Sequence, residues 1–147
     1  ADNQAIITAA KMGEKKGKKH IISTAFEHHA VLHALEALEK QGFEVTYLPI
    51  NDNGIIKVDD VKNAIRPDTC LVTVMYANNE IGTIQPIAEL GAICKKHGVI
   101  LVSDEIHCDL TNPGLKYVPF ASLEEDIVEN SIHKHSKKAE NLNFLLI

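Results

Sequence analysis

Two kinds of apolar spacing alternate along this sequence, and that alternation restricts the fold more than any other feature. Helix-like spacing covers four segments, residues 1–16, 29–41, 58–65 and 87–97. Short β-prone runs come between and after them, at residues 21–24, 45–48, 70–76 and 99–102. Strands that alternate with helices at this spacing predict right-handed βαβ units. We therefore expect an α/β fold with three layers, α/β/α, around a mostly parallel sheet.

The composition excludes several classes of protein. The 147 residues are 45% hydrophobic and 24% charged, as in globular domains. The net charge is -5 with a single arginine, Arg66, so we expect no nucleic-acid partner. No apolar run approaches the roughly 20 residues of a membrane span, and no signal peptide opens the chain. We expect a cytoplasmic protein. Because the chain lacks an initial Met and ends on an apolar run, we also expect that both ends are cut.

Polar residues follow three of the expected strands. Because ligands bind beyond the carboxyl ends of parallel strands, these residues mark one edge of the sheet as the candidate site. The three groups are Glu27-His28-His29, Asn78-Asn79-Glu80 and Asp104-Glu105-Ile106-His107.

Three of these side chains have a functional and a purely structural interpretation. Asp104 closes a buried strand, where a carboxylate needs a partner such as the protonated ring nitrogen of pyridoxal phosphate; otherwise it caps a helix or lies in a surface turn. His28 would stack on a flat ring or transfer protons, or would only begin a helix. Asn79 would donate to a ring hydroxyl, or would only form a turn.

Lysines near the end of the sequence are candidates for a Schiff base. They are Lys134 and Lys137, and each is otherwise a solvent-exposed lysine. His29 and His33 have the i, i+4 spacing of metal ligands on a helix, but no third ligand is evident. We predict no metal site.

Six stretches of residues 1–98 together have the pattern of a known family: Ala1-Asp2-Asn3, residues 18–24, residues 27–32, residues 42–48, Asn53-Gly54-Ile55-Ile56 and Asn78-Asn79-Glu80-Ile81-Gly82. In these stretches, residues 1–98 resemble the NifS/IscS-like cysteine desulfurases of the class V aminotransferase family. The resemblance implies a fold-type I enzyme with pyridoxal 5'-phosphate that takes sulfur from L-cysteine and yields L-alanine. It implies that His28 stacks on the cofactor ring and that Asn79 lies near the phenolic oxygen of the ring.

Three stretches after residue 98 have a different pattern: residues 103–110, Pro119-Phe120-Ala121-Ser122-Leu123 and Asn130-Ser131-Ile132. In these stretches, residues 99–147 resemble the MalY/PatB-type cystathionine β-lyases of the class I/II aminotransferase family. Both resemblances imply that Asp104 pairs with the ring nitrogen and that His107 occupies a place beside the ring hydroxyl. Ser136-Lys137 fits the lyase pattern and His133-Lys134 fits the desulfurase pattern, so we favour Lys137 and keep Lys134. The resemblance thus changes from one family to the other near residues 98–104.

These resemblances imply that residues 1–147 are the central part of a large cofactor-binding domain, without the phosphate-loop segment and the C-terminal small domain. We favour a cysteine desulfurase of iron-sulfur cluster assembly with little activity alone. The alternatives are a C–S β-lyase or aminotransferase acting on a thioether amino acid, and a catalytically silent truncated or interaction module. The intact relative is expected to be a homodimer with a sulfur-acceptor partner. Cys70 and Cys94 are interpreted as inert buried thiols, Cys108 as incidental, and Arg66 as unrelated to substrate binding.

Overall fold

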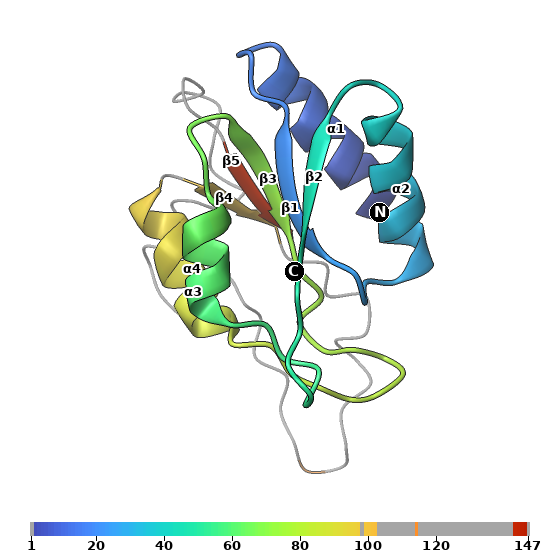
Figure 1. Cartoon of the computed structure of the whole chain (residues 1–147), viewed down its shortest axis with the longest axis vertical. Coiled ribbons are helices and arrows are strands. Elements are labelled where there is room, and N and C mark those ends of the chain that lie inside the picture. The colour runs from blue at the N-terminus through green and yellow to red at the C-terminus, as the bar shows by residue number, and fades with distance from the viewer. Residues whose placement is uncertain (1, 98, 103–113, 115–142, 147) are drawn as a thin grey trace.

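The computed structural model describes residues 2–97, 99–102, 114 and 143–146. These residues form a sheet of five strands with helices on both faces (Figure 1). The helices are α1 (Asp2–Glu14), α2 (His29–Glu39), α3 (Val58–Ala64) and α4 (Ile87–Lys96). The strands are β1 (His20–Thr24), β2 (Glu44–Leu48), β3 (Thr69–Thr73), β4 (Val99–Val102) and β5 (Asn143–Leu146).

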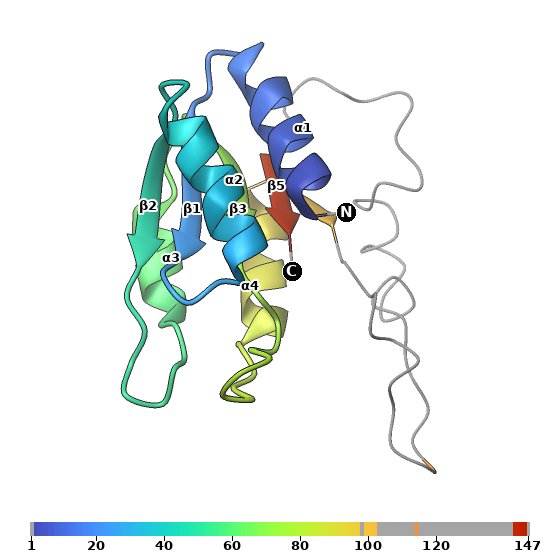
Figure 2. The same ribbon diagram turned by 90° about the vertical axis from the view of Figure 1, so that its right-hand side faces the viewer.

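The sheet is parallel throughout, with the strand order β2-β1-β3-β5-β4. Successive residues of a strand point to opposite faces, so each strand contributes to both sides of the sheet. Ile21 belongs to the apolar cluster that contains buried residues of α1 and α2, and Ile22 belongs to the cluster of α3 and α4. Figure 2 looks onto the layer of α1 and α2, with the strands behind it. The predicted three-layer α/β/α fold is confirmed.

Helix α1 approaches β3 closely because it carries a glycine at the contact. A Cβ atom placed on Gly13 would lie 2.3 Å from Cβ of Cys70 and 3.3 Å from the carbonyl oxygen of Lys18. No real side chain tolerates the first of these distances. Gly13 is therefore a requirement of the packing between helix and sheet near the amino ends of the strands.

The third strand is shorter than the sequence predicts, since β3 ends at Thr73 and not at Tyr76. The amide of Met75 donates instead to the carboxylate of Glu27, at 2.8 Å. Beyond it, the amide of Gln85 donates to the carbonyl oxygen of Tyr76 and closes a loop, in which Ala77 and Ile84 form an antiparallel bridge. The β-prone residues after Thr73 thus leave the sheet because side chains and the loop bind their backbone groups.

Strand β5 was not predicted. The sequence marks residues 144–147 only as an apolar run, whereas the structure pairs Asn143–Leu146 with β3 on one side and β4 on the other. An apolar run is typical of a parallel strand with neighbours on both edges.

Candidate active site

The chain passes from β1 into α2 at the lower edge of the sheet in Figure 1, and His28 belongs to this connection. It is the N-cap residue of α2, and its Nδ1 accepts a hydrogen bond from the amide of Ala30 at 3.2 Å. A ring nitrogen that accepts carries no proton, so the neutral ring holds its proton on Nε2. The side chain is exposed. The cap fixes one edge of the imidazole while the ring stays accessible to a ligand.

The preceding residue, Glu27, has the opposite environment. It is 6% exposed, and its Oε1 accepts from the hydroxyl of Thr24 at 2.7 Å and from the amide of Met75 at 2.8 Å. Burial raises the pKa of this carboxyl, and the two hydrogen bonds oppose that shift. Glu27 therefore ties the loop after β1 to the first residues beyond β3.

Asn78 makes a second tie between the same two loops. It is 8% exposed, and its Nδ2 donates to the carbonyl oxygen of Phe26 at 3.1 Å. Its Oδ1 accepts from the amides of Glu80 and Ile81, at 2.9 and 3.0 Å, and so shapes its own loop. The neighbouring Asn79 is exposed.

The expectation that the polar residues after β1 and after β3 meet at one edge is thus confirmed. The loops that carry His28 and Asn79 are hydrogen-bonded to each other. The sequence pointed to the exposed His28 and Asn79, and missed that Glu27 and Asn78 hold their loops. A buried glutamate beside a histidine leaves no spacing signal, so its partners only become visible in three dimensions.

The other candidate site residues lie outside the described part of the chain: Asp104, His107, Lys134 and Lys137. Strand β4 ends at Val102 and runs parallel to its neighbour β5, so its carboxyl end lies at the same edge of the sheet. The positions of these four side chains stay predictions.

Gln85 joins a third loop to this edge, although its residue type and position are too generic to single it out in the sequence. It is 2% exposed; its Nε2 donates to the carbonyl oxygen of Gly54 at 2.8 Å and its Oε1 accepts from the amide of Ile56 at 3.0 Å. Gly54 has a φ of +72°, and a Cβ there would lie 2.8 Å from Cδ1 of Ile81. The turn after β2 therefore packs against the loop after β3.

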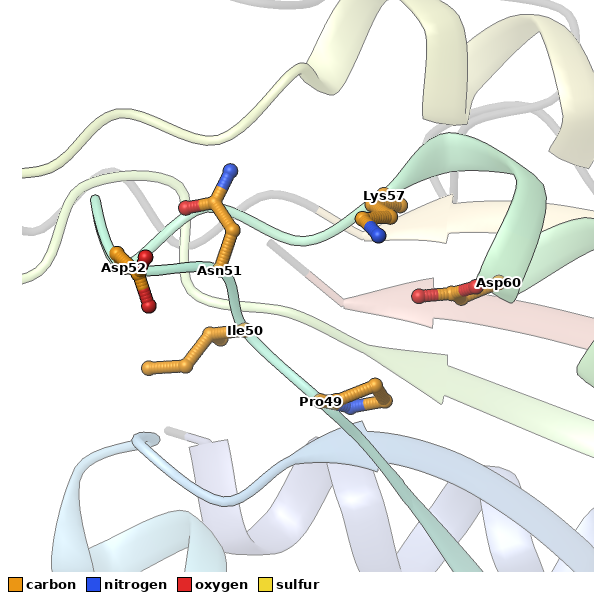
Figure 3. Close-up of a pocket in the computed structure, with 6 residues that line it drawn as sticks. All are labelled: Pro49, Ile50, Asn51, Asp52, Lys57 and Asp60. Atoms are coloured by element: carbon orange, nitrogen blue, oxygen red, sulfur yellow. The ribbon is translucent and has the colours of Figure 1, made fainter.

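That turn lines a small pocket of about 290 Å³ (Figure 3). The pocket contains none of the candidate site residues, and Oδ1 of Asn51 is already engaged by the amides of Asn53 and Ile55. Its lining residues are Pro49, Ile50, Asn51, Asp52, Lys57 and Asp60. We assign it no role in the site.

Within the part of the chain that the structure describes, no three His, Cys, Asp or Glu side chains are grouped as metal ligands. The rings of His29 and His33 stack with their centroids 5.9 Å apart, which is a pair and not a three-ligand set. Among the described residues no helix is long and apolar enough to cross a membrane.

Cys70 is a buried thiol at the start of β3. Its Sγ donates to the carbonyl oxygen of His20 at 3.3 Å, and burial raises its pKa to about 11. A thiol in this state is a poor nucleophile at neutral pH. The interpretation of Cys70 as a buried thiol is confirmed, and its inertness stays a prediction. The structure does not describe the side chains of Cys94 and Cys108.

Arg66 lies at the opposite, amino edge of the sheet. Its guanidinium donates to both carboxylate oxygens of Glu44, at 2.6 and 3.0 Å, and to both of Asp68, at 2.9 and 2.7 Å. Glu44 begins β2 and Asp68 directly precedes β3. The interpretation that Arg66 has no part in the candidate site agrees with this position.

Residues 1–134 match the family model for aminotransferase class-V. A cysteine desulfurase IscS of Clostridium botulinum (strain Hall) is 46% identical over 134 residues, which cover 91% of this chain and 32% of the relative. A mitochondrial cysteine desulfurase of Saccharomyces cerevisiae is 44% identical over 126 residues, 82% of this chain and 25% of the relative. The chain thus spans about a third or less of the length of these relatives.

Solved structures agree with this assignment. The structure of DndA from Streptomyces lividans is 47% identical with a TM-score of 0.62, over 64% of this chain and 26% of that one. A structure described as SspA in complex with cysteine is 34% identical with a TM-score of 0.62, over 70% of this chain and 30% of that one. Sequence match, identity and fold lead to one conclusion: the chain belongs to the aminotransferase class-V family and is similar to its cysteine desulfurases.

Proposed function

We propose that this chain is the central part of the cofactor-binding domain of a cysteine desulfurase. One observation carries the proposal: His28 and Asn79 stand exposed on two hydrogen-bonded loops at the carboxyl ends of parallel strands, in a chain about 46% identical to such enzymes. In the overall reaction, the sulfur of L-cysteine passes to an enzyme thiol as a persulfide, and L-alanine is left. Cys70 does not fit the receiving thiol, because it is buried.

The described residues fit pyridoxal phosphate, the cofactor of this family. When bound, this group supplies an electron sink for bond changes at the substrate α-carbon. An exposed imidazole held by its N-cap bond offers a flat face for a ring, and its Nε2 proton can be donated. The exposed amide of Asn79 can donate to a ring hydroxyl.

Three further roles, assigned to four residues, are part of the proposal. Asp104 would keep the ring nitrogen protonated, and His107 would neighbour the ring hydroxyl. Lys137, with Lys134 as the alternative, would bind the cofactor covalently. These assignments depend on the sequence positions, beyond the end of β4 and in the last part of the chain.

A homodimer is proposed for the intact protein. It is supported by apolar side chains exposed beside the site: Tyr76, Ile81 and Ile84 are 53, 61 and 59% exposed. Exposed apolar residues that cluster in one loop are typical of an interface. A sulfur-acceptor partner and a cytoplasmic location stay predictions from the resemblance.

The test is to add pyridoxal phosphate to the purified chain and record its visible absorption. We expect the band of a lysine-linked cofactor, and we expect Lys137→Ala to abolish it. Loss of the band in Lys134→Ala instead would reassign the lysine. Absence of any band would favour the alternative of a catalytically silent chain.

Products separate the two enzymatic alternatives. With L-cysteine, a desulfurase yields alanine and a persulfide, whereas a C–S β-lyase yields pyruvate, ammonia and a thiol from a thioether amino acid. The lyase alternative is supported by residues 103–110, which resemble the MalY/PatB type. However, the class V match runs through residue 134 and so includes these residues. We therefore favour the desulfurase.

A further inference from the structure

Two buried polar side chains sit directly beside the two exposed candidate residues. Glu27 precedes His28 and Asn78 precedes Asn79 in the sequence. The two pairs have the same pattern, since the first member is at least nine-tenths buried and the second is exposed. In each pair the buried side chain binds a backbone group of the loop that carries the other pair.

The two bonds run in opposite directions. Glu27 accepts from a backbone amide beyond β3, while Asn78 donates to a backbone carbonyl before α2. Two such hydrogen bonds between the same loops restrict how far the loop after β1 can slide along, or move away from, the loop after β3. The hydroxyl of Thr24, the last residue of β1, fixes the carboxylate of Glu27 from the strand side.

Both side chains are costly to bury unless they serve these contacts. Taking a carboxylate and an amide out of water carries a penalty that only satisfied hydrogen bonds offset. An apolar pair would fill the same space without that penalty. What the polar pair adds is a defined position of one loop relative to the other.

We propose that Glu27 and Asn78 are positioning residues that together hold His28 and Asn79 in register across the candidate site. The inference deepens the proposed function and depends on it where a cofactor is involved. The structural part of the proposal is that the positions of His28 and Asn79 depend on the buried side chains, and this part requires no ligand.

The test compares variants that keep or remove the hydrogen-bonding atoms that join the two loops. Glu27→Gln keeps the acceptor oxygen for Met75 and Thr24, whereas Glu27→Ala removes it. Asn78→Asp keeps the acceptor oxygen that shapes the loop, but it replaces the donor to Phe26 with a second carboxylate oxygen and so also adds a negative charge. Glu36→Ala, which removes an exposed carboxylate from α2, is the matched control.

Amide hydrogen exchange and NMR signals are recorded first, without cofactor. In Glu27→Ala we expect exchange at Met75 to rise about tenfold or more. We also expect the Ala30 amide, which reports on the His28 ring, and the Asn79 side chain to shift. In Asn78→Asp the Glu80 and Ile81 amides stay protected while Ala30 and Asn79 shift. Glu27→Gln and Glu36→Ala resemble the parent chain.

Titration with pyridoxal phosphate follows. We expect Glu27→Ala and Asn78→Asp each to bind it about tenfold more weakly, with Glu27→Gln restoring parental affinity. Unchanged Ala30 and Asn79 signals in Glu27→Ala and Asn78→Asp would overturn the proposal. Exchange that rises evenly over the whole chain would also overturn it, since it indicates only lost stability. If Glu27→Ala does not fold, Asn78→Asp gives the decision. If the parent chain binds no cofactor, the proposed function fails while the NMR comparison still decides the positioning role.

Discussion

The two edges of the sheet use polar side chains in different ways. At the amino edge, the charged side chains and the His20 ring bind other side chains: Arg66 bridges Glu44 and Asp68, and His20 lies with Nδ1 2.7 Å from Oγ1 of Thr69. At the carboxyl edge, the buried side chains bind backbone groups of other loops, and the residues next to them stay exposed.

This difference suggests separate roles for the two edges, stability at the amino edge and ligand binding at the carboxyl edge. Side chains that use their hydrogen-bonding groups on one another, as at the amino edge, do not offer those groups to a ligand. Side chains that bind backbone fix the course of a loop and leave its neighbouring side chains available. Ligand sites at the carboxyl ends of parallel strands depend on such fixed loops. The comparison predicts that substitutions at the amino edge change stability, and that those at the carboxyl edge change ligand binding.

The largest effect on stability is expected for Gly13→Ala, near the amino edge. The new Cβ would lie 2.3 Å from Cβ of Cys70, so α1 must move away from β3. Overpacking of this kind costs about 1–3 kcal/mol of unfolding free energy. Urea unfolding measures the loss.

Gly91→Ala in α4 is the control for Gly13→Ala, because a Cβ at Gly91 meets nothing within 4 Å. Alanine is the better helix former, and we expect about 0.5–1 kcal/mol of added stability. Equal stability of the two variants would show that α1 and β3 leave room for a Cβ atom at position 13.

The edges are also expected to respond to pH in opposite directions, and Glu27→Gln tests the carboxyl edge. Burial raises the pKa of Glu27 in the folded chain, so the folded state holds the proton more tightly than the unfolded state. The parent chain therefore loses stability as pH rises from the ordinary glutamate pKa through the raised one. The stability of Glu27→Gln relative to the parent should increase over that window, in urea unfolding at a series of pH values. A difference that falls or stays constant with pH would contradict the raised pKa.

Arg66→Gln tests the amino edge. Hydrogen bonds from Arg66 lower the pKa values of Glu44 and Asp68, so these pairs stabilise the fold above the ordinary carboxyl pKa and lose that effect as pH falls through the lowered values. Burial also lowers the pKa of His20, so acid favours the unfolded state there too. The variant should be less stable than the parent chain at pH 7, and nearly as stable as the parent at pH 3. Because these ion pairs are exposed, 1 M salt should reduce the loss of stability at pH 7. An equal loss at both pH values would show that the charges of Glu44 and Asp68 do not matter.

The sequence predicted the elements that have clear periodicity, and it predicted that the polar loops after β1 and β3 meet at one edge of the sheet. Strands β1 and β2 and the four helices lie within one or two residues of their predicted bounds, because apolar spacing is a local property. It overestimated β3, whose last β-prone residues leave the sheet because Glu27 binds the Met75 amide across 48 residues of sequence. It also missed β5, since pairing between β3 and β4 depends on distant partners.

For the same reason the sequence pointed to the exposed candidates His28 and Asn79 and missed the buried roles of Glu27 and Asn78. His28 and Asn79 are recognisable by type and by their place after a strand. Residue type and position alone do not distinguish Asn78 from Asn79, yet one is buried and the other exposed.

The smallest effect on stability, and the sharpest test of the comparison, is expected for His28→Asn. Asparagine is a strong N-cap residue, so its side chain can replace Nδ1 of His28 as acceptor at the start of α2. The free energy of unfolding should change by less than about 0.5 kcal/mol. The flat ring and its Nε2 proton are lost, however, so the visible spectrum and the affinity of added pyridoxal phosphate should change. A large loss of stability with unchanged cofactor binding would place His28 with the structural residues of the amino edge and remove the distinction between the two edges.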